Sequence, residues 1–354
     1  MVAKTREDKW QILRGLCIIS VVLIHCDCGV VDSFPNTSSE FIFWVIIRCI
    51  INFAVPSFIF MTGYFISPEK IELGYIQYLK SRIGRLLVPY VIWSLIYAFK
   101  RIALSIITGE NIDFLTILYK FVSGEFQLYY IIALAQLTIL TPVLYRICKT
   151  ESFINKIIYI ISPIYILFLF LYNFFFGGNS PLYQTFFFLW ISIYYLGMQM
   201  KINPNSLEKI VKILGNKISI FIALMLSVLE SFMLIYVIKV SNSFSITHLK
   251  IMTMVYATTI VLYFYRKKAQ EMYGLGKIII TFGNNSFGIF FVHTFIIMLV
   301  RPLMKKVFST SLWFACMSST FVVSLFFSLI MVVVVKKVLL HYHKEKYINY
   351  LGLN

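Results

Sequence analysis

The chain has 354 residues, of which 60% are hydrophobic and 13% are charged, and its formal net charge is +17. A soluble protein of this length needs more charged surface, so the composition excludes a soluble globular fold and indicates a polytopic membrane protein. The 32 basic residues occur in short clusters between apolar runs. This pattern is typical of membrane orientation signals and argues against nucleic-acid binding.

About ten apolar runs are long enough, at roughly 20 residues each, to cross a bilayer as helices. The predicted spans are residues 11–31, 42–66, 86–107, 128–147, 153–175, 183–200, 218–239, 249–265, 278–300 and 312–336. An even number of spans places both termini on one side, and the distribution of basic residues predicts that this side is cytoplasmic. We therefore expect an all-α membrane protein of about ten transmembrane helices, with residues 1–354 forming a single domain.

One predicted outer loop departs from the positive-inside pattern, because it carries Arg301, Lys305 and Lys306. We expect this loop to face anionic headgroups or a charged acceptor.

The first predicted span carries two polar residues, Arg14 and His25, eleven positions apart. On an α-helix eleven residues are almost whole turns, so both side chains leave the same face about 16 Å apart along the axis. Polar groups are costly in hydrocarbon unless they face partners or water, so we expect the two residues to share a wet cleft. A histidine can take a proton from a hydroxyl near neutral pH. The alternative is that His25 only bonds a neighbouring helix.

In the second predicted span, Pro56 and Gly63 are expected to loosen the helix, although both are also common in membrane helices for packing reasons. Arg48 lies in the same span and needs a partner or water. Glu230, in the middle of a later span, is expected to pair with Arg48 or Arg101, or to orient a histidine.

A basic stretch follows, in which Arg82 and Arg85 are three residues apart and would be neighbours on a helix. Two guanidinium groups at the cytoplasmic surface of the membrane suit a phosphate-bearing cofactor, whereas the alternative is positive-inside anchoring.

The run His25-Cys26-Asp27-Cys28 resembles a metal site only superficially, because the side chains of neighbouring helical residues point about 100° apart. Asp27 likewise can orient His25 only if the helix breaks there. The six cysteines lie mostly in apolar runs, which argues against a disulfide framework. We therefore predict no metal site.

Six features in chain order resemble the acyltransferase-3 family of integral membrane O-acyltransferases. They are Arg14 and His25 at their spacing, FAVPSFIFMTGYF (53–65), Arg82 and Arg85 leading into LLVPY (86–90), QLYYIIALAQLTILTPVL (127–144), YYLGMQM (194–200) and NSFGIFFVHTFII (285–297). The resemblance covers essentially the whole chain, and it is the order of the set that makes it specific.

The resemblance implies a bundle of about ten helices without a fused soluble esterase-like domain. It implies an acyl-CoA donor, expected to be acetyl-CoA, that arrives from the cytoplasm. It further implies that Arg82 and Arg85, with Arg14, bind the phosphates and that His25 deprotonates an acceptor hydroxyl. The implied acceptor is a sugar of a bacterial surface polysaccharide or a lipid-linked precursor, which would place the protein in the bacterial inner membrane among its lipids.

Four residues are weaker candidates for acceptor binding: Arg48, Gln127, Tyr129 and His293. His293 matches a recurrent histidine of the family whose role is either structural or acceptor-binding. Gln127 stands where many members have His and Tyr129 where many have Trp, which bears on the identity of the acceptor.

Two rival functions remain. A transporter of glycan units or lipid-linked sugars would also line a pathway with polar groups, but it would predict a pseudo-repeat between halves, and none is visible. A non-catalytic subunit of a glycan-synthesis complex would not need Arg14 and His25 in phase.

Overall fold

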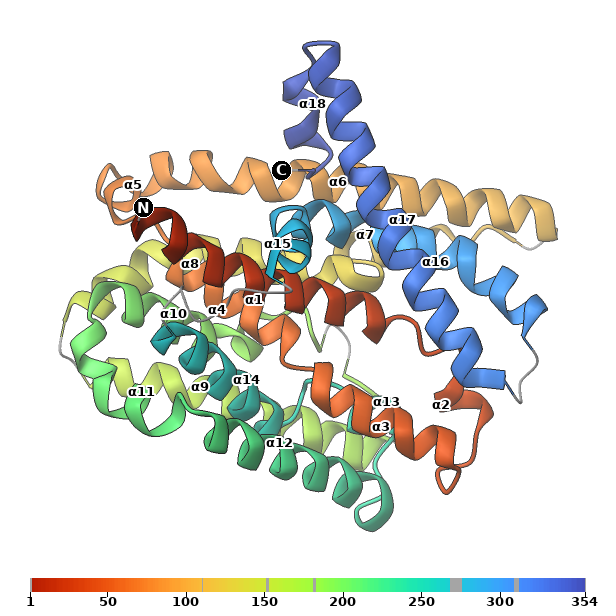
Figure 1. The fold of residues 1–354 in the computed structure, drawn as a ribbon, viewed down its shortest axis with the longest axis horizontal. Helices are drawn as coiled ribbons and strands as arrows, with labels where there is room; N and C mark the ends of the chain where they lie inside the picture. Colours follow the sequence, from red (N-terminus) through yellow and green to blue (C-terminus); the bar gives the residue numbers. More distant parts are fainter. Residues whose placement is uncertain are drawn as a thin grey trace.

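The computed structural model describes residues 2–109, 111–150, 153–180, 183–267, 276–308 and 312–353, with side chains described from residue 8 onward. Within these ranges the regular structure is helical, without a strand. Figure 1 shows α6 (Tyr75–Thr108) along the top of the view and α12 (Lys217–Phe232) along the bottom, with α1 (Val2–Ile24) between them.

Seven helical segments in the described ranges are long and apolar enough to cross a membrane. They are Ser39–Tyr64 (α3, Ser39–Ile51, with α4, Ala54–Tyr64), Tyr75–Thr108 (α6), Phe126–Lys149 (η1, Phe126–Leu128, with α8, Tyr129–Lys149), Ile154–Phe176 (α9), Lys217–Val237 (α12 with η4, Met233–Val237), Ser286–Val307 (α16) and Trp313–His341 (α17). Their outer faces expose large apolar side chains such as Ile107, Phe221 and Phe327, as a surface in contact with lipid requires. The predicted all-α membrane class is confirmed.

The three other predicted spans coincide with α1, α10 (Ile191–Ile202) and α14 (Ile251–Arg266). The predicted helix 183–200 is helical mainly in its second half, because residues 183–190 form a loop that contains only the short turn η2 (Phe187–Leu189). At about 1.5 Å per residue, α10 alone is too short to cross about 30 Å of hydrocarbon. The count of ten spans stays a prediction.

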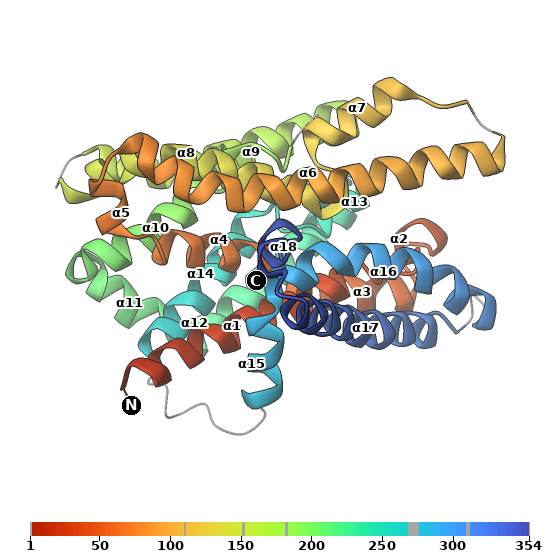
Figure 2. The ribbon, with the colours of Figure 1, turned by 90° about the horizontal axis from the view of Figure 1, so that it is seen from above.

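Short helices connect the long ones, and one more, α18, follows the last of them. They are α2 (Val30–Ser33), α5 (Pro68–Glu72), α7 (Phe114–Ser123), η3 (Pro204–Leu207), α11 (Glu208–Leu214), α13 (Asn242–Ser245), α15 (Gly276–Asn284) and α18 (Glu345–Tyr350). Seen from above, α16 and α17 lie side by side and α7 folds back along α6 (Figure 2).

The second predicted span, where we expected Pro56 to loosen the helix, is interrupted in the structure. Helix α3 ends at Ile51 and α4 begins at Ala54. Pro56 has no N–H, and its ring would collide with the carbonyl of the residue four positions earlier, so an unbroken helix is disfavoured there. The break frees the end of α3 to contact other elements.

Two helix crossings are close because both helices carry glycine at the contact. Where α4 crosses α10, a Cβ atom on Gly63 would lie 2.0 Å from the Tyr194 carbonyl oxygen, and one on Gly197 would lie 2.2 Å from that of Phe60. Gly63 therefore serves packing rather than loosening.

Helix α1 is held against α15 in the same way. A Cβ atom on Gly15 would lie 2.1 Å from the Ile279 carbonyl oxygen, and one on Gly283 would lie 2.0 Å from that of Gln11. Because Gly15 directly follows Arg14, this crossing fixes the position of the first candidate residue.

Candidate active site

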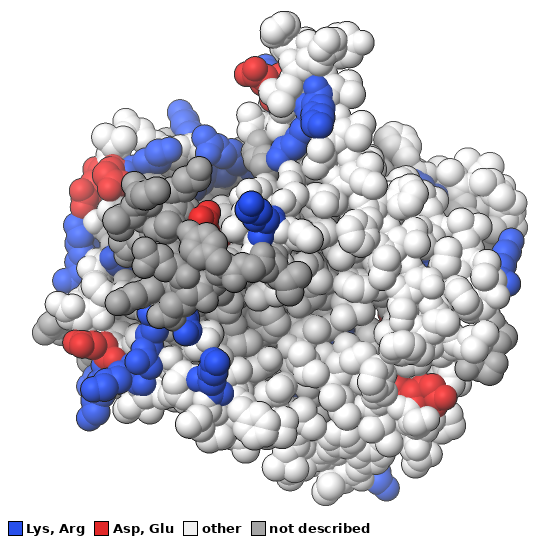
Figure 3. Space-filling model, viewed as in Figure 1, with Lys and Arg blue, Asp and Glu red and all other residues white. Residues whose placement is uncertain are grey.

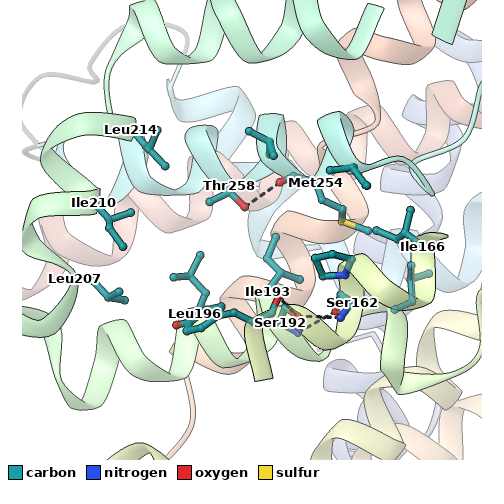
Figure 4. A pocket seen from close by; sticks show the side chains of 15 residues that line it. Ser162, Ile166, Ser192, Ile193, Leu196, Leu207, Ile210, Leu214, Met254 and Thr258 are labelled. Atoms are coloured by element: carbon teal, nitrogen blue, oxygen red, sulfur yellow. Dashed lines mark hydrogen bonds between the residues drawn. The ribbon is translucent and has the colours of Figure 1, made fainter. Parts of the chain in front are cut away.

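A large apolar hollow between α9, α10 and α14 does not have the chemistry of an active site (Figure 4). Its serines are used by the protein: the Ser162 hydroxyl donates to the Phe188 carbonyl at 2.9 Å and accepts from the Ser192 N–H at 3.1 Å. The rest of its lining is mainly Leu, Ile and Met. The candidate catalytic residues lie elsewhere.

Arg14 and His25 open into two adjoining cavities rather than one shared cleft. The arginine cavity, of about 450 Å³, is lined by Gln11, Arg14, Phe58, Thr62, Leu86, Tyr130, Leu134, Gly283, Asn284, Ser286, Phe287 and Phe290. The histidine cavity, of about 280 Å³, is lined by Val21, Ile24, His25, Arg48, Val55, Phe58, Phe126, Gln127, Tyr129, Tyr130, Tyr183, Gln184, Thr247, His248 and Phe290. The two cavities have Phe58, Tyr130 and Phe290 in common, and we call these three side chains the aromatic collar. The collar comes from α4, α8 and α16, and it stands between the two candidate residues.

His25 lies one residue beyond α1, in a turn closed by the His25 N–H and the Val22 carbonyl at 3.2 Å. The helix does therefore end at this point, as orientation by Asp27 would require. Asp27 instead pairs with Arg301 at 3.1 Å. No group of three or more metal-ligating side chains occurs in the part of the chain that the structure describes.

Two arginines hold the end of α1. The Arg48 guanidinium donates to the Ile24 carbonyl at 3.0 Å, and that of Arg301 donates to the His25 carbonyl. The last carbonyls of a helix have no intrahelical partner, so two cations there pair with them and interact favourably with the negative end of the helix dipole. Arg301, which we expected to face headgroups or acceptor, turns inward and positions His25.

His293 lies behind His25. Its ring centroid is 5.3 Å from that of His25, and the side chain is fully buried. Nδ1 meets the Ile289 carbonyl at 3.0 Å, and Nε2 meets the Thr294 hydroxyl at 3.2 Å. His293 is not among the residues that line the histidine cavity, and both of its alternative roles stay predictions.

Gln127 lines the histidine cavity, yet its amide is used by the protein. The amide nitrogen Nε2 donates to the Tyr97 hydroxyl at 3.1 Å and to the Phe290 carbonyl at 3.3 Å, and Oε1 accepts from the Thr294 hydroxyl at 2.6 Å. These bonds tie η1 to α6 and α16. Tyr129, two residues later, also lines the cavity.

On the other side of the collar, Arg14 lines the arginine cavity, with its guanidinium 5.0 Å from the centre of the Phe65 ring. Arg82 lies within α6 and donates to the Ser67 hydroxyl at 2.7 Å. Arg14 and Arg82 thus both contact the segment 65–67 that follows α4. Arg85 is exposed, one position before Leu86, which lines the arginine cavity.

The ion pairs expected for Glu230 are wrong. Glu230 accepts a hydrogen bond from the Met252 N–H at 3.0 Å, in the first turn of α14. Arg101 pairs with Glu125, and Arg48 binds the backbone carbonyls of Ile24 and Ile246. A carboxylate at a helix N-terminus satisfies free N–H groups, so Glu230 fixes the start of α14.

His248 was not singled out from the sequence. It precedes α14, is 4% exposed, and lines the histidine cavity with its neighbour Thr247. Burial, with Arg48 and Lys250 nearby, lowers the pKa of His248 to about 3, so the ring is neutral at physiological pH. The sequence signal was weak: one histidine in a short polar segment before an apolar run.

The fold and the cavities define an integral membrane protein with a buried polar site that contains histidine. Comparison with known families shows the chain's affiliation: residues 8–334 match the model of the acyltransferase-3 family, described as an acyltransferase domain, and the chain belongs to this family. It is a membrane acyltransferase. The searches of curated proteins and of solved structures each gave no match.

Proposed function

We propose that the protein transfers an acetyl group from acetyl-CoA to a hydroxyl of a bacterial surface polysaccharide or lipid-linked sugar, in the bacterial inner membrane. The observation that supports this most strongly is that the histidine cavity and the arginine cavity adjoin across the aromatic collar. A cationic chamber next to a chamber holding a candidate base suits a phosphate-bearing donor and a hydroxyl acceptor.

The charge distribution supports entry of the donor at the end where α1 begins. Lys and Arg gather near the N-terminus, α5 and α11, while most of the remaining visible face is uncharged (Figure 3). Positive charge gathers on the cytoplasmic side of membrane proteins. Arg14 lies within α1 and His25 lies just beyond the end of this helix, so the arginine cavity is the nearer of the two to this basic end. Acetyl-CoA in the cytoplasm would reach Arg14 first.

In the proposed reaction the acceptor oxygen attacks the thioester carbonyl carbon, so that a C–O bond forms and the C–S bond breaks. His25 takes the hydroxyl proton and CoA leaves as the thiol once protonated. Arg14, with Arg82 and Arg85, binds the phosphates of the donor. Holding both substrates in place lowers the activation barrier, because the entropy cost of bringing two molecules together has already been met on binding.

The test is transfer of labelled acetyl from acetyl-CoA in membranes that contain the wild-type protein, Arg14→Gln or Arg146→Gln. Arg146 is exposed on α8 and serves as the matched cationic control. We expect Arg14→Gln to raise the KM for acetyl-CoA by about ten-fold or more, since a lost charge-assisted hydrogen bond is worth roughly 1.5–3 kcal/mol. Transfer that does not depend on acetyl-CoA, or an unchanged KM, would contradict the proposal.

A further inference from the structure

His248 lines the histidine cavity and carries a polar atom that the described residues do not use. The side chain is 4% exposed and its ring lies 5.3 Å from the Trp190 ring, tilted by 32°. Its Nε2 atom is buried without a hydrogen-bond partner among the described residues. A buried polar atom left unpaired costs free energy, so such an atom on a residue that lines a cavity points to a ligand that would pair with it.

The loop that carries His248 is fixed from two sides. The Arg48 Nε and Asn52 Nδ2 groups of the α3 end both donate to the Ile246 carbonyl, at 3.2 Å and 2.9 Å. Beyond the loop, Glu230 accepts from the Met252 N–H at 3.0 Å and holds the start of α14. Because rigid helices hold both ends, the imidazole of His248 has a defined place, as a group that selects a substrate needs.

The same cavity offers a small ligand both polar groups and apolar faces. His25 and His248 line it together, with Arg48 and Gln184 among the polar groups and Phe126 among the aromatic ones. At about 280 Å³ the cavity lies near the lower end of the range for small-molecule sites. Both histidines therefore line one space of a size that suits a small ligand.

We propose that His248 binds a second hydroxyl of the acceptor, next to the one that His25 deprotonates, and thereby determines which hydroxyl is acylated. This inference rests on the proposed function. It narrows the acceptor to a compound with at least two neighbouring hydroxyls and assigns His248 as a specificity-determining residue. A simple alcohol would leave His248 Nε2 unpaired.

The experiment replaces the chromosomal gene in the host by His248→Ala, His248→Gln or the control His341→Ala, whose histidine is exposed at the end of α17. Nuclear magnetic resonance of the purified surface polysaccharide gives the amount and position of its acetyl esters. Titration calorimetry of each purified variant with acetyl-CoA reports whether the donor site is intact.

In His248→Ala we expect the original ester to fall about ten-fold or more, or to spread over neighbouring hydroxyls, with acetyl-CoA affinity within about two-fold of wild type. The amide of His248→Gln can bond a hydroxyl and should restore part of the ester at its original position. His341→Ala should match wild type. Wild-type ester level and position in His248→Ala would overturn the inference, as would loss of acetyl-CoA binding in both His248 variants. If the wild-type gene adds no ester to the polysaccharide, the proposed function fails and this inference fails with it.

Discussion

The imidazole rings of His25 and His293 lie with centroids 5.3 Å apart and planes tilted by 44°, one beyond the end of α1 and the other within α16. His293 is fully buried and bonded to the Ile289 carbonyl and the Thr294 hydroxyl. His293 is therefore held in place next to His25, which lines the histidine cavity. We infer that His293 positions His25.

His293→Ala should lower kcat for acyl transfer by about 10- to 100-fold, because a misplaced base loses much of its effect. The KM for acetyl-CoA should stay near wild type, since the arginine cavity is untouched. Initial rates over a range of donor concentrations separate the two constants. A wild-type kcat would show that His25 does not need His293, and an equal loss in donor binding would indicate general unfolding.

The aromatic collar predicts that one substitution can stop acyl transfer without stopping donor binding. If the acetyl group must pass the collar to reach His25, Phe58→Trp should reduce transfer at least about ten-fold while acetyl-CoA still binds, because one larger ring overfills a packed contact. Phe58→Leu, which removes volume, is the matched control and should keep transfer. Donor binding by calorimetry and label transfer in membranes give the two readouts. Full transfer by Phe58→Trp would mean that the acetyl group takes another route.

The glycine crossing between α4 and α10 predicts a stability difference between two glycine substitutions. Gly63→Ala places a Cβ atom 2.0 Å from the Tyr194 carbonyl oxygen and should cost about 1–3 kcal/mol or more. Gly84→Ala meets nothing within 4 Å inside α6 and should be neutral or stabilising by up to about 1 kcal/mol. Thermal unfolding in detergent, followed by size-exclusion chromatography, compares their Tm values. Equal Tm values for the two variants would contradict this packing.

The short distance between Cys28 and Cys316 predicts that an oxidant can join them by a disulfide. Their sulfur atoms lie 3.3 Å apart, and both side chains are buried. Treatment of the folded protein with the thiol oxidant diamide should join them, because a small shift brings the sulfurs to the bonding distance of about 2.05 Å. Peptide mapping without reductant should show this pair, and Cys28→Ser should abolish it. Recovery of both cysteines as free thiols from folded, oxidised protein would argue against the contact between the Asp27–Cys28 turn and α17.

The parts of the fold that depend on local patterns could be predicted from the sequence. The apolar runs predicted the membrane class, and Pro56 predicted a loosened helix close to where the structure has the break between α3 and α4. The spacing of Arg14 and His25 identified two residues that do line cavities, although it could not show that aromatic side chains from three other helices stand between them. Sequence spacing along one helix carries no information on what the neighbouring helices contribute.

The interactions that the sequence could not predict are contacts between distant parts of the chain. Arg48 binds the carbonyl of Ile246, and Arg301 binds that of His25. An arginine in an apolar run signals only that a partner exists, because backbone carbonyls as partners leave no trace in the residue types. His248 has the same difficulty: its place in the cavity follows from the anchoring of its loop by α3 and α12.

The most direct test of the account is the acyl transfer rate of His25→Ala. The variant should be checked for normal membrane insertion and for wild-type affinity for acetyl-CoA, which we propose the arginine cavity binds. The rate of labelled acetyl transfer in membranes should then fall by at least about 100-fold, since a positioned general base typically raises a rate by a factor of about 10²–10⁴. Transfer at the wild-type rate by a correctly inserted His25→Ala protein would contradict the catalytic role on which the account depends.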